Sequence, residues 1–480
     1  MWISRRLRIN TFYSLILASL LLISSGCSEE SKITDTPQPD KISEISIPDY
    51  SGKAIVAINT STSSSGYADL GTTPRTLPSI SIAEVIKHKL FQKDIPDSHI
   101  SNKKTSLAGF DDPIETLTHT DTTHTFEAYD IPNGTGSTPV YVDATLQYGS
   151  STSKCLIYVE DGYTNLIEAV SGGTETLATD WNEIGQAFDD EIYTRITEKF
   201  GPYYDIDSNE KVIFLFYNVD PDENDNAFSN GFLAGYFWPQ DIVPVSSVYT
   251  NKKDMVYMNL VTYGLTETLQ TLAHEYTHLV AYSVRRISDL NDSNTDLGLI
   301  DTWLNEGIAE AAAHYALDSP LTTNITVMKT GSPIRNGEVG IFHWTGSGYN
   351  YPLVYSFVQY ARIQGTSGYD LFSNIIQHSS GTYSSLEELV TGENDSFSNI
   401  SDIVRGFHIA NVVNQETGIY GYKDERSVFS FVNLSAPESS TTQILPGAAV
   451  NYYPSNDDTN SYIPSGADSE IHYYRINADD

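Results

Sequence analysis

Cysteine is almost absent from this sequence of 480 residues, which contains only Cys27 and Cys155. Cys27 belongs to an N-terminal targeting signal, so Cys155 has no partner for an intramolecular disulfide. Cys155 begins the apolar run 155–159. We expect a buried structural thiol there rather than a nucleophile, because no histidine lies nearby in a supporting pattern.

Basic residues are also scarce. Lys and Arg total 27 against 62 Asp and Glu, which gives a formal net charge of −35 and a pI near 4.4. Nucleic-acid binding needs a basic surface, so we expect no nucleic-acid partner. Charged residues make up only 19% and hydrophobic residues 40% of the chain. This balance excludes wholesale disorder and is sufficient for a sizeable core, in a chain long enough for two or three domains.

The N-terminus carries a targeting signal. Three arginines among the first eight residues precede the apolar run 13–23, which is too short and wrongly flanked for a transmembrane helix. The following Gly26 and Cys27 resemble a bacterial lipobox, although Ser24 replaces the usual leucine. We therefore expect residues 1–26 to be a lipoprotein signal peptide and Cys27 to be lipidated. The exported protein would be anchored to a bacterial cell membrane on its periplasmic or cell-surface side. The alternative is ordinary secretion after cleavage near Gly26.

Composition divides the rest of the chain into four predicted parts. Residues 27–115 form a polar tether and a poorly assigned N-terminal region. Residues 116–165 alternate between apolar and polar side chains, which predicts a small β-domain. Residues 166–420 form the main domain, and residues 421–480 are a β-rich C-terminal segment. We find no internal repeat.

The main domain mixes helical and strand patterns, which predicts an α+β fold. Apolar spacing predicts an amphipathic helix over 177–200. Short apolar runs predict strands at 211–216 and 254–259. Three further helices are expected, at 266–285, 302–317 and 352–364. We expect a mixed sheet packed on the helix 266–285, followed by a more helical lower half.

Two histidines and a glutamate on the helix 266–285 form the strongest chemical signal. His274 and His278 are four residues apart, so both imidazoles lie on one helix face and can bind one cation. Glu275 lies between them, where its carboxylate can take a proton from a metal-activated water. The sequence therefore predicts a zinc site with Glu275 as the general base.

A second element completes this predicted site. A catalytic zinc has three protein ligands and one open position. Glu306, within the stretch 302–310, can supply the third ligand from a separate helix. Glu310 follows on the same helix face and is suited to accept a hydrogen bond from a ligand imidazole. Alternatively, Glu310 is an ordinary solvated carboxylate on the helix surface.

The two elements together resemble the gluzincin clan of zinc metallopeptidases. Within this clan the chain is most similar to the hyicolysin-type neutral metallopeptidases. The similarity also includes 235–238 with Asp241, the strand around Tyr257, and 350–360, so that it covers about residues 120–410. It implies a zincin-like fold flanked by β-rich segments and a zinc-dependent endopeptidase acting on extracytoplasmic proteins or peptides.

Three related enzyme classes do not fit. Metzincins need a glycine and a third histidine soon after the motif, but Leu279 to Ser283 follow His278 here. Gluzincin aminopeptidases carry a Gly-x-Met-x-Asn motif that this chain lacks, which favours internal cleavage of a polypeptide. Serine hydrolases need a Gly-x-Ser-x-Gly elbow, which is also missing. The remaining alternative is a lipid-anchored, adhesin-like binding protein on a peptidase scaffold, against which the intact Glu275 argues.

Two roles in the predicted site have several candidates. A donor must stabilise the negative charge of the reacting carbonyl, and the resemblance favours Tyr351 for this role. The other candidates are His343, Tyr349, Tyr355 and Tyr360. The strand 255–260 is a candidate edge strand for pairing with an extended substrate, or else an interior strand.

Calcium is a further candidate cofactor. The acidic loops 205–210 and 220–225 alternate oxygen-bearing side chains, which suits a hard cation. Neither has the complete pattern of an EF-hand, and ordinary solvated turns are the alternative. The oligomeric state is not indicated by the sequence.

Overall fold

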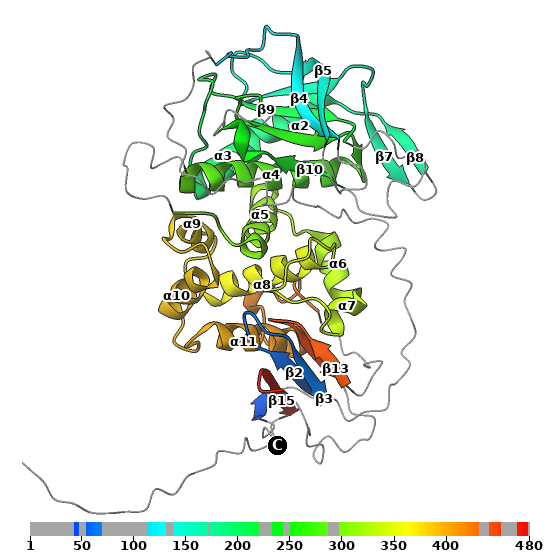
Figure 1. The fold of residues 1–480 in the computed structure, drawn as a ribbon. Helices are drawn as coiled ribbons and strands as arrows, with labels where there is room; N and C mark the ends of the chain where they lie inside the picture. Colours follow the sequence, from blue (N-terminus) through cyan, green and yellow to red (C-terminus); the bar gives the residue numbers. More distant parts are fainter. Residues whose placement is uncertain are drawn as a thin grey trace, which may run out of the picture. The chain divides into compact units, whose positions relative to one another are not determined.

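The computed structural model describes residues 43–47, 54–69, 114–130, 138–170, 173–219, 233–242, 250–286, 297–431, 441–452 and 468–478. The predicted signal peptide, the lipidation site Cys27 and the acidic loop 220–225 lie outside these residues. The described chain is a mixed α+β structure, as predicted (Figure 1).

A six-stranded sheet occupies the first half of the described chain. Its strand order is β10-β11-β9-β6-β5-β4, with β6, β9 and β11 parallel and the other neighbours antiparallel. All six residues of β9 are buried, because helices and strands cover both faces of this central strand. The strands are β4 Thr123–Asp130, β5 Thr138–Tyr148, β6 Cys155–Glu160, β9 Val212–Tyr217, β10 Gly235–Phe237 and β11 Met255–Asn259.

The sheet continues across the predicted boundary at residue 165. β6, which lies in the segment 116–165, pairs in parallel with β9 of the main domain. The two segments therefore share one sheet, because a buried apolar strand such as β6 needs a neighbour on each side. Cys155 at the start of β6 is fully buried, as expected of a structural thiol. A smaller sheet, β12-β7-β8, joins the same region, and its strands are β7 Leu166–Val170, β8 Gly173–Leu177 and β12 Val261–Thr262.

The helix α4 Leu265–Arg286 crosses the six-stranded sheet and contacts its strands β10 and β11. The predicted helix 177–200 is a continuous helical run, but it begins only at Trp181. The side chain of Asp180 accepts a hydrogen bond from the backbone of Asn182 and caps the helix there. This run consists of α2 Trp181–Ala187, the π-helical η3 Phe188–Ile192 and α3 Tyr193–Phe200.

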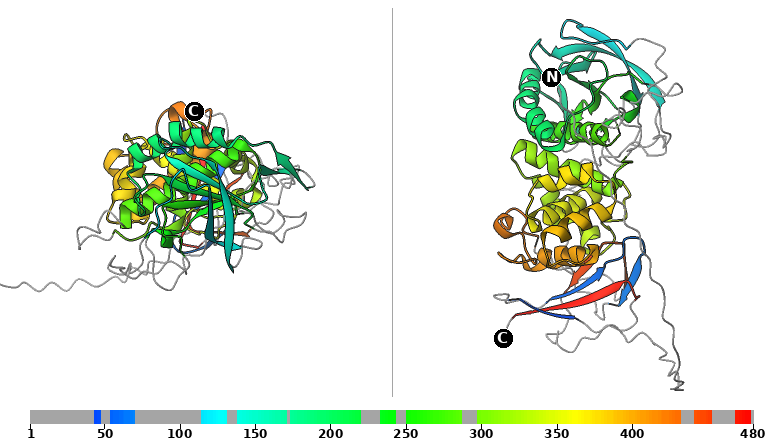
Figure 2. Two further views of the ribbon diagram at one scale, coloured as in Figure 1. Left: turned by 90° about the horizontal axis from the view of Figure 1, so that it is seen from above. Right: turned by 90° about the vertical axis from the view of Figure 1, so that its left-hand side faces the viewer.

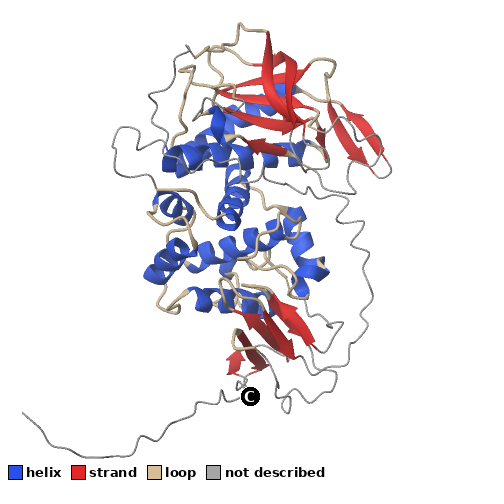
Figure 3. Cartoon of the chain, viewed as in Figure 1, coloured by secondary structure: helices blue, strands red, loops and turns tan. Residues whose placement is uncertain are grey.

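The chain from 302 to 425 is mainly helical (Figure 3). α5 contacts α4 on one side and α8 on the other, and all residues of α8 are buried. Among the described residues, no helix combines the length and the apolar character that a membrane span requires. The elements are α5 Thr302–Leu317, α6 Thr322–Thr330, α7 Ser332–Arg335, α8 Asn350–Gln364, α9 Asp370–Gln377, α10 Tyr383–Glu393, α11 Ile400–Val413 and the 3-10 helix η5 Lys423–Glu425. A further 3-10 helix, η4 Pro239–Asp241, follows β10.

The two ends of the described chain meet in one sheet. Its order is β1-β15-β2-β14, and β13 pairs separately with β3. The blue and red strands lie side by side in Figure 1 and in the right-hand view of Figure 2. β2 carries a fully buried apolar run, so it needs neighbours on both sides and obtains them from the C-terminal segment. The strands are β1 Ser43–Ile47, β2 Ala54–Asn59, β3 Gly66–Asp69, β13 Thr441–Ile444, β14 Ala449–Tyr452 and β15 Ile471–Ala478.

Candidate metal centre

α4 and α5 bring the predicted ligands together. His274, Glu275 and His278 lie on α4, and Glu306 lies in the first turns of α5. These four polar side chains are between 1% and 7% exposed, although the two helices pack on each other mainly through apolar residues. Buried polar groups need compensating partners, so this cluster requires a chemical explanation.

The three predicted ligands present their donor atoms to one another. His274 Nε2 lies 3.0 Å from His278 Nε2 and 3.1 Å from Glu306 Oε2. His278 Nε2 lies 3.3 Å from Glu306 Oε1. Two ligand atoms at zinc–nitrogen distance in a tetrahedral site are about 3.4 Å apart, so these spacings suit a single cation. Two nitrogens and one carboxylate are also the donors that zinc accepts in catalytic sites.

The charges of the cluster support the same conclusion. Burial would lower the pKa of His274, but the hydrogen bond and the negative charge of Glu306 outweigh it and raise that pKa to about 9. Burial would raise the pKa of Glu306, but the neighbouring imidazoles hold it below its usual range. The carboxylate therefore stays ionised and attracts positive charge, which a proton or a metal cation can supply.

Two further side chains contact the outer nitrogens of the imidazoles. Glu310 Oε1 lies 3.8 Å from His274 Nδ1, and its other oxygen accepts a hydrogen bond of 2.7 Å from Asn324. The amide nitrogen Nδ2 of Asn305 lies 3.0 Å from His278 Nδ1. A ligand imidazole carries its proton on this outer nitrogen, so the Glu310 carboxylate can accept from His274, and the Asn305 amide can accept from His278 when its oxygen takes the place of Nδ2. Sequence reasoning missed Asn305, although its position directly before Glu306 was the available signal.

Glu275 lines a pocket beside the cluster, together with His278 and Glu306. The other walls come from 236–239 at the end of β10, from the last turns of α4 and from 298–302. β10 approaches α4 closely at Gly235, where a Cβ atom would lie 3.2 Å from Glu275 Cγ and 2.9 Å from a backbone oxygen. A glycine is therefore needed where β10 passes over the carboxylate.

The edge of the six-stranded sheet is β10 rather than the strand 255–260. β11 lies between β10 and β9, so the interior alternative for that strand is confirmed. The short β10 was not expected to be the edge, because its three residues are too few to show a strand pattern. Tyr236 and Phe237 of β10 line the pocket together with Glu275.

Tyr351 lies at the start of α8, and its ring centre is 6.5 Å from that of His274. It is buried and packs edge to face on Trp344 at 4.9 Å. The hydroxyls of Tyr355 and Tyr360 contact His314 at 3.0 Å and a backbone oxygen of residue 419 at 2.6 Å, away from the cluster. His343, another candidate, is exposed.

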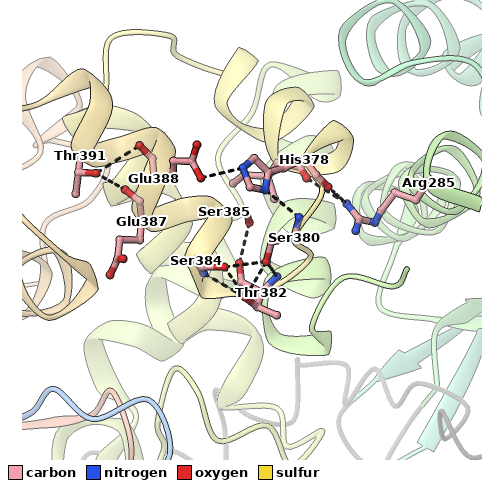
Figure 4. Close-up of polar contacts among 10 residues, drawn as sticks. Arg285, His378, Ser380, Thr382, Ser384, Ser385, Glu387, Glu388 and Thr391 are labelled. Carbon is pink, nitrogen blue, oxygen red and sulfur yellow. Dashed lines mark hydrogen bonds and ion pairs between the residues drawn. The ribbon is translucent and has the colours of Figure 1, made fainter. Parts of the chain in front are cut away.

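Arg285 joins the C-terminal end of α4 to the helical part of the chain (Figure 4). Its guanidinium is buried and donates to backbone oxygens of Leu297, Gly298, Ile375, Ile376 and His378 at 2.5–3.4 Å. Of these acceptors, Gly298 lines the pocket and Leu297 directly precedes it in the chain. Arg285 therefore fixes one wall of the pocket to the helix that carries the predicted ligands.

Comparison with known proteins gives one informative match. No family model matches the chain. Over 308 residues the chain is 28% identical to the neutral metalloprotease ShpI of Staphylococcus hyicus. The chain is similar to a neutral metalloprotease. The matched region is 61% of this chain and 66% of that protein, slightly less than two thirds of the relative's length. Together with the His274–His278–Glu306 group, the similarity supports a metallopeptidase that uses a metal ion.

Proposed function

We propose that this protein is a zinc-dependent endopeptidase that hydrolyses internal peptide bonds of extracytoplasmic proteins or peptides. The observation that carries the proposal is the convergence of His274, His278 and Glu306 within 3.3 Å, beside the carboxylate of Glu275. The similarity to a neutral metalloprotease supports the same reaction class. The N-terminal signal further supports a protein that is lipidated at Cys27 and anchored to a bacterial membrane.

The proposed reaction divides the chemistry between the ion and the chain. A zinc ion would supply Lewis acidity, which polarises the peptide carbonyl and makes a water molecule more acidic. Glu275 takes the proton from the attacking water and returns it to the leaving amine. The hydroxyl of Tyr351 donates a hydrogen bond to the carbonyl oxygen as negative charge develops there.

The surroundings of Glu275 suggest how a polypeptide would bind. Among the described residues β10 is an edge strand, so the backbone groups on its outer side can pair with an extended segment of substrate. Aromatic side chains at its end, Tyr236, Phe237 and Trp238, line the pocket together with Tyr282. We infer that the enzyme binds an unfolded or extended segment and places an apolar substrate side chain in this pocket.

Cleavage of unfolded casein by residues 28–480 tests this function. We expect chelator-sensitive cleavage by the wild type, and a loss of at least about a hundredfold in Glu275→Gln with zinc retained. Tyr351→Phe should lower kcat more than it changes KM. Tyr349→Phe tests the neighbouring candidate in the same way and should leave kcat unchanged if Tyr351 is the donor.

Each remaining outcome has a definite meaning. If the wild type and Glu275→Gln both bind zinc and neither cleaves casein, the alternative of a surface-anchored binding protein is favoured. Folded protein without bound zinc would refute the metal site itself. Equal cleavage by wild type and Glu275→Gln would refute the role of Glu275 as general base.

A further inference from the structure

A second group of acidic side chains lies away from the His274–His278–Glu306 cluster. Asp205 and Asp207 precede β9, and Asp254 directly precedes β11. Because β9 and β11 are parallel neighbours, their first residues lie together. One carboxylate oxygen from each aspartate lies within 4.8 Å of the other two.

The unusual feature of this group is the burial of oxygens without donors. Asp254 is 1% exposed, and neither of its carboxylate oxygens has a donor in hydrogen-bond geometry in the described part of the chain, although the backbone N–H groups of Ile206 and of Asp254 itself oppose the rise of its pKa. Asp207 is 3% exposed, and one of its carboxylate oxygens also lacks a hydrogen-bond donor among the described residues. Buried carboxylates are stable only with hydrogen-bond donors, a counter-charge or a proton. These three oxygens therefore need a partner.

The surrounding loop holds the carboxylates in place without satisfying them. Both oxygens of Asp205 accept backbone N–H groups, from Asn209 at 3.1 Å and Glu210 at 2.9 Å. The second oxygen of Asp207 accepts from the side chain of Asn209 at 3.1 Å. The donors fix the side chains while lone pairs stay available, as in a prepared ligand set.

A nearby aspartate shows how this chain compensates a buried carboxylate without a cation. Asp241 is fully buried, and its oxygens accept from the backbone N–H of Asn251 at 2.7 Å and the hydroxyl of Tyr257 at 2.6 Å. Asp254 is equally buried and has no such donors within the described residues. The difference indicates that another group compensates Asp254.

Two other compensating groups fit less well. The charge of Lys253 acts on Asp207 and Asp254, but its ammonium donates to the backbone oxygen of Glu115 and, among the described residues, lies within ion-pair distance of none of the three aspartates. Burial raises the pKa of Asp254 well above its usual range, so a proton is the other candidate. A proton would serve one oxygen only and would leave the rest unpartnered.

We propose that Asp205, Asp207 and Asp254 bind a divalent cation of the calcium class. A purely oxygen donor set selects a hard cation rather than zinc, and backbone oxygens or water complete its six to eight ligands. The site joins the candidate loop 205–210 to Asp254, which directly precedes the distant strand β11. The cation is structural, because it joins this loop to the start of β11. The same loop is also held to α4 at its start, where the backbone N–H of Tyr204 donates to the hydroxyl of Ser283 at 3.0 Å.

Thermal unfolding and terbium luminescence test the site on residues 28–480 with zinc kept saturating. Ca²⁺ is compared with Mg²⁺, and Tb³⁺ replaces Ca²⁺ as a luminescent probe excited through neighbouring tyrosines. Asp254→Asn removes one charge and keeps the side-chain shape. Glu198→Gln, at an exposed position of α3, removes the same charge elsewhere and is the matched control.

We expect Ca²⁺ to raise the Tm of the wild type and of Glu198→Gln by about 4 °C or more. Tb³⁺ should occupy one site that Ca²⁺ displaces, and Asp254→Asn should lose both responses while retaining zinc. The proposal is overturned if Ca²⁺ leaves the wild type unchanged, or if Asp254→Asn responds as the wild type does. If Ca²⁺ does not change the Tm of the wild type and Asp254→Asn is more stable than the wild type, Asp254 is compensated by a proton and not by a cation. Because the wild type alone can refute the site, the test does not depend on the variant folding.

Discussion

Arg285→Met is the substitution that most directly tests how α4 is held in the fold. Methionine can replace the apolar stem of the arginine, but it removes the guanidinium N–H groups that donate to five backbone oxygens. The distances range from 2.5 to 3.4 Å, and the side chain is 2% exposed. The change is therefore mainly the loss of hydrogen bonds at constant packing.

The magnitude follows from the number and burial of these acceptors. A hydrogen bond to a charged group contributes about 1.5–3 kcal/mol, but five bonds from one group are not additive. Removing one partner from a buried charged network costs about 3–5 kcal/mol. We expect Arg285→Met to lower the free energy of unfolding by about 4 kcal/mol. A domain with 5–15 kcal/mol of stability would still fold.

Urea unfolding followed by tryptophan fluorescence measures this loss. Arg285→Lys keeps the charge but not the planar set of donors, so its free energy of unfolding should lie between those of the wild type and Arg285→Met. Arg426→Met is the control, because Arg426 is about half exposed and pairs with the exposed Glu416. The pocket wall at 298–302 should loosen in Arg285→Met, which raises KM while zinc is retained. A loss below about 1 kcal/mol, similar to that of Arg426→Met, would refute the reasoning.

Three further predictions concern other parts of the chain. Asn305→Ala should weaken zinc binding about 10–100-fold by freeing His278, as measured by competition with a chelating dye; unchanged affinity would contradict the contact. Burial lowers the pKa of His408 from 6.5 to about 4, so only the unfolded chain takes up this proton between those pH values and stability falls as the pH drops. His408→Gln keeps a donor to the Gly447 oxygen. Between pH 6.5 and 4 its free energy of unfolding, measured in urea, should therefore fall by up to about 3 kcal/mol less than that of the wild type. Equal decreases in the two proteins would exclude His408 as the cause. Cys27→Ala should abolish lipid labelling and release the protein from the membrane fraction; a variant that stays in that fraction would refute anchoring by this cysteine.

Patterns of local spacing explain which parts of the fold could be predicted. The helix 266–285 was expected and extends over Leu265–Arg286, because its apolar positions repeat without an interrupting proline or glycine. The strand 211–216 was expected from a continuous apolar run and is observed as Val212–Tyr217. The strands of 27–115 were not expected. Their partners lie between 372 and 431 positions away along the chain, beyond the reach of any local pattern.

The candidate site shows the same division. His274 and His278 could be paired from spacing alone, and Glu306 from the stretch that contains it. The contact of Tyr351 with His274 could not be derived in this way, because it depends on how α8 packs against α5. The domain boundaries, the lipid anchor and the roles of the individual site residues remain predictions.

The sequence by itself determined the chemistry that the chain can offer: two imidazoles one helical turn apart, a carboxylate between them, and a third ligand on a second helix. These features depend on the helical repeat, which is local. Only the tertiary structure decided which strand forms the sheet edge beside Glu275, and that Asp254 joins Asp205 and Asp207. It also decided that the first and last strands of the described chain lie in one sheet. These features follow from burial and strand pairing between residues far apart in the chain, which a local pattern does not encode.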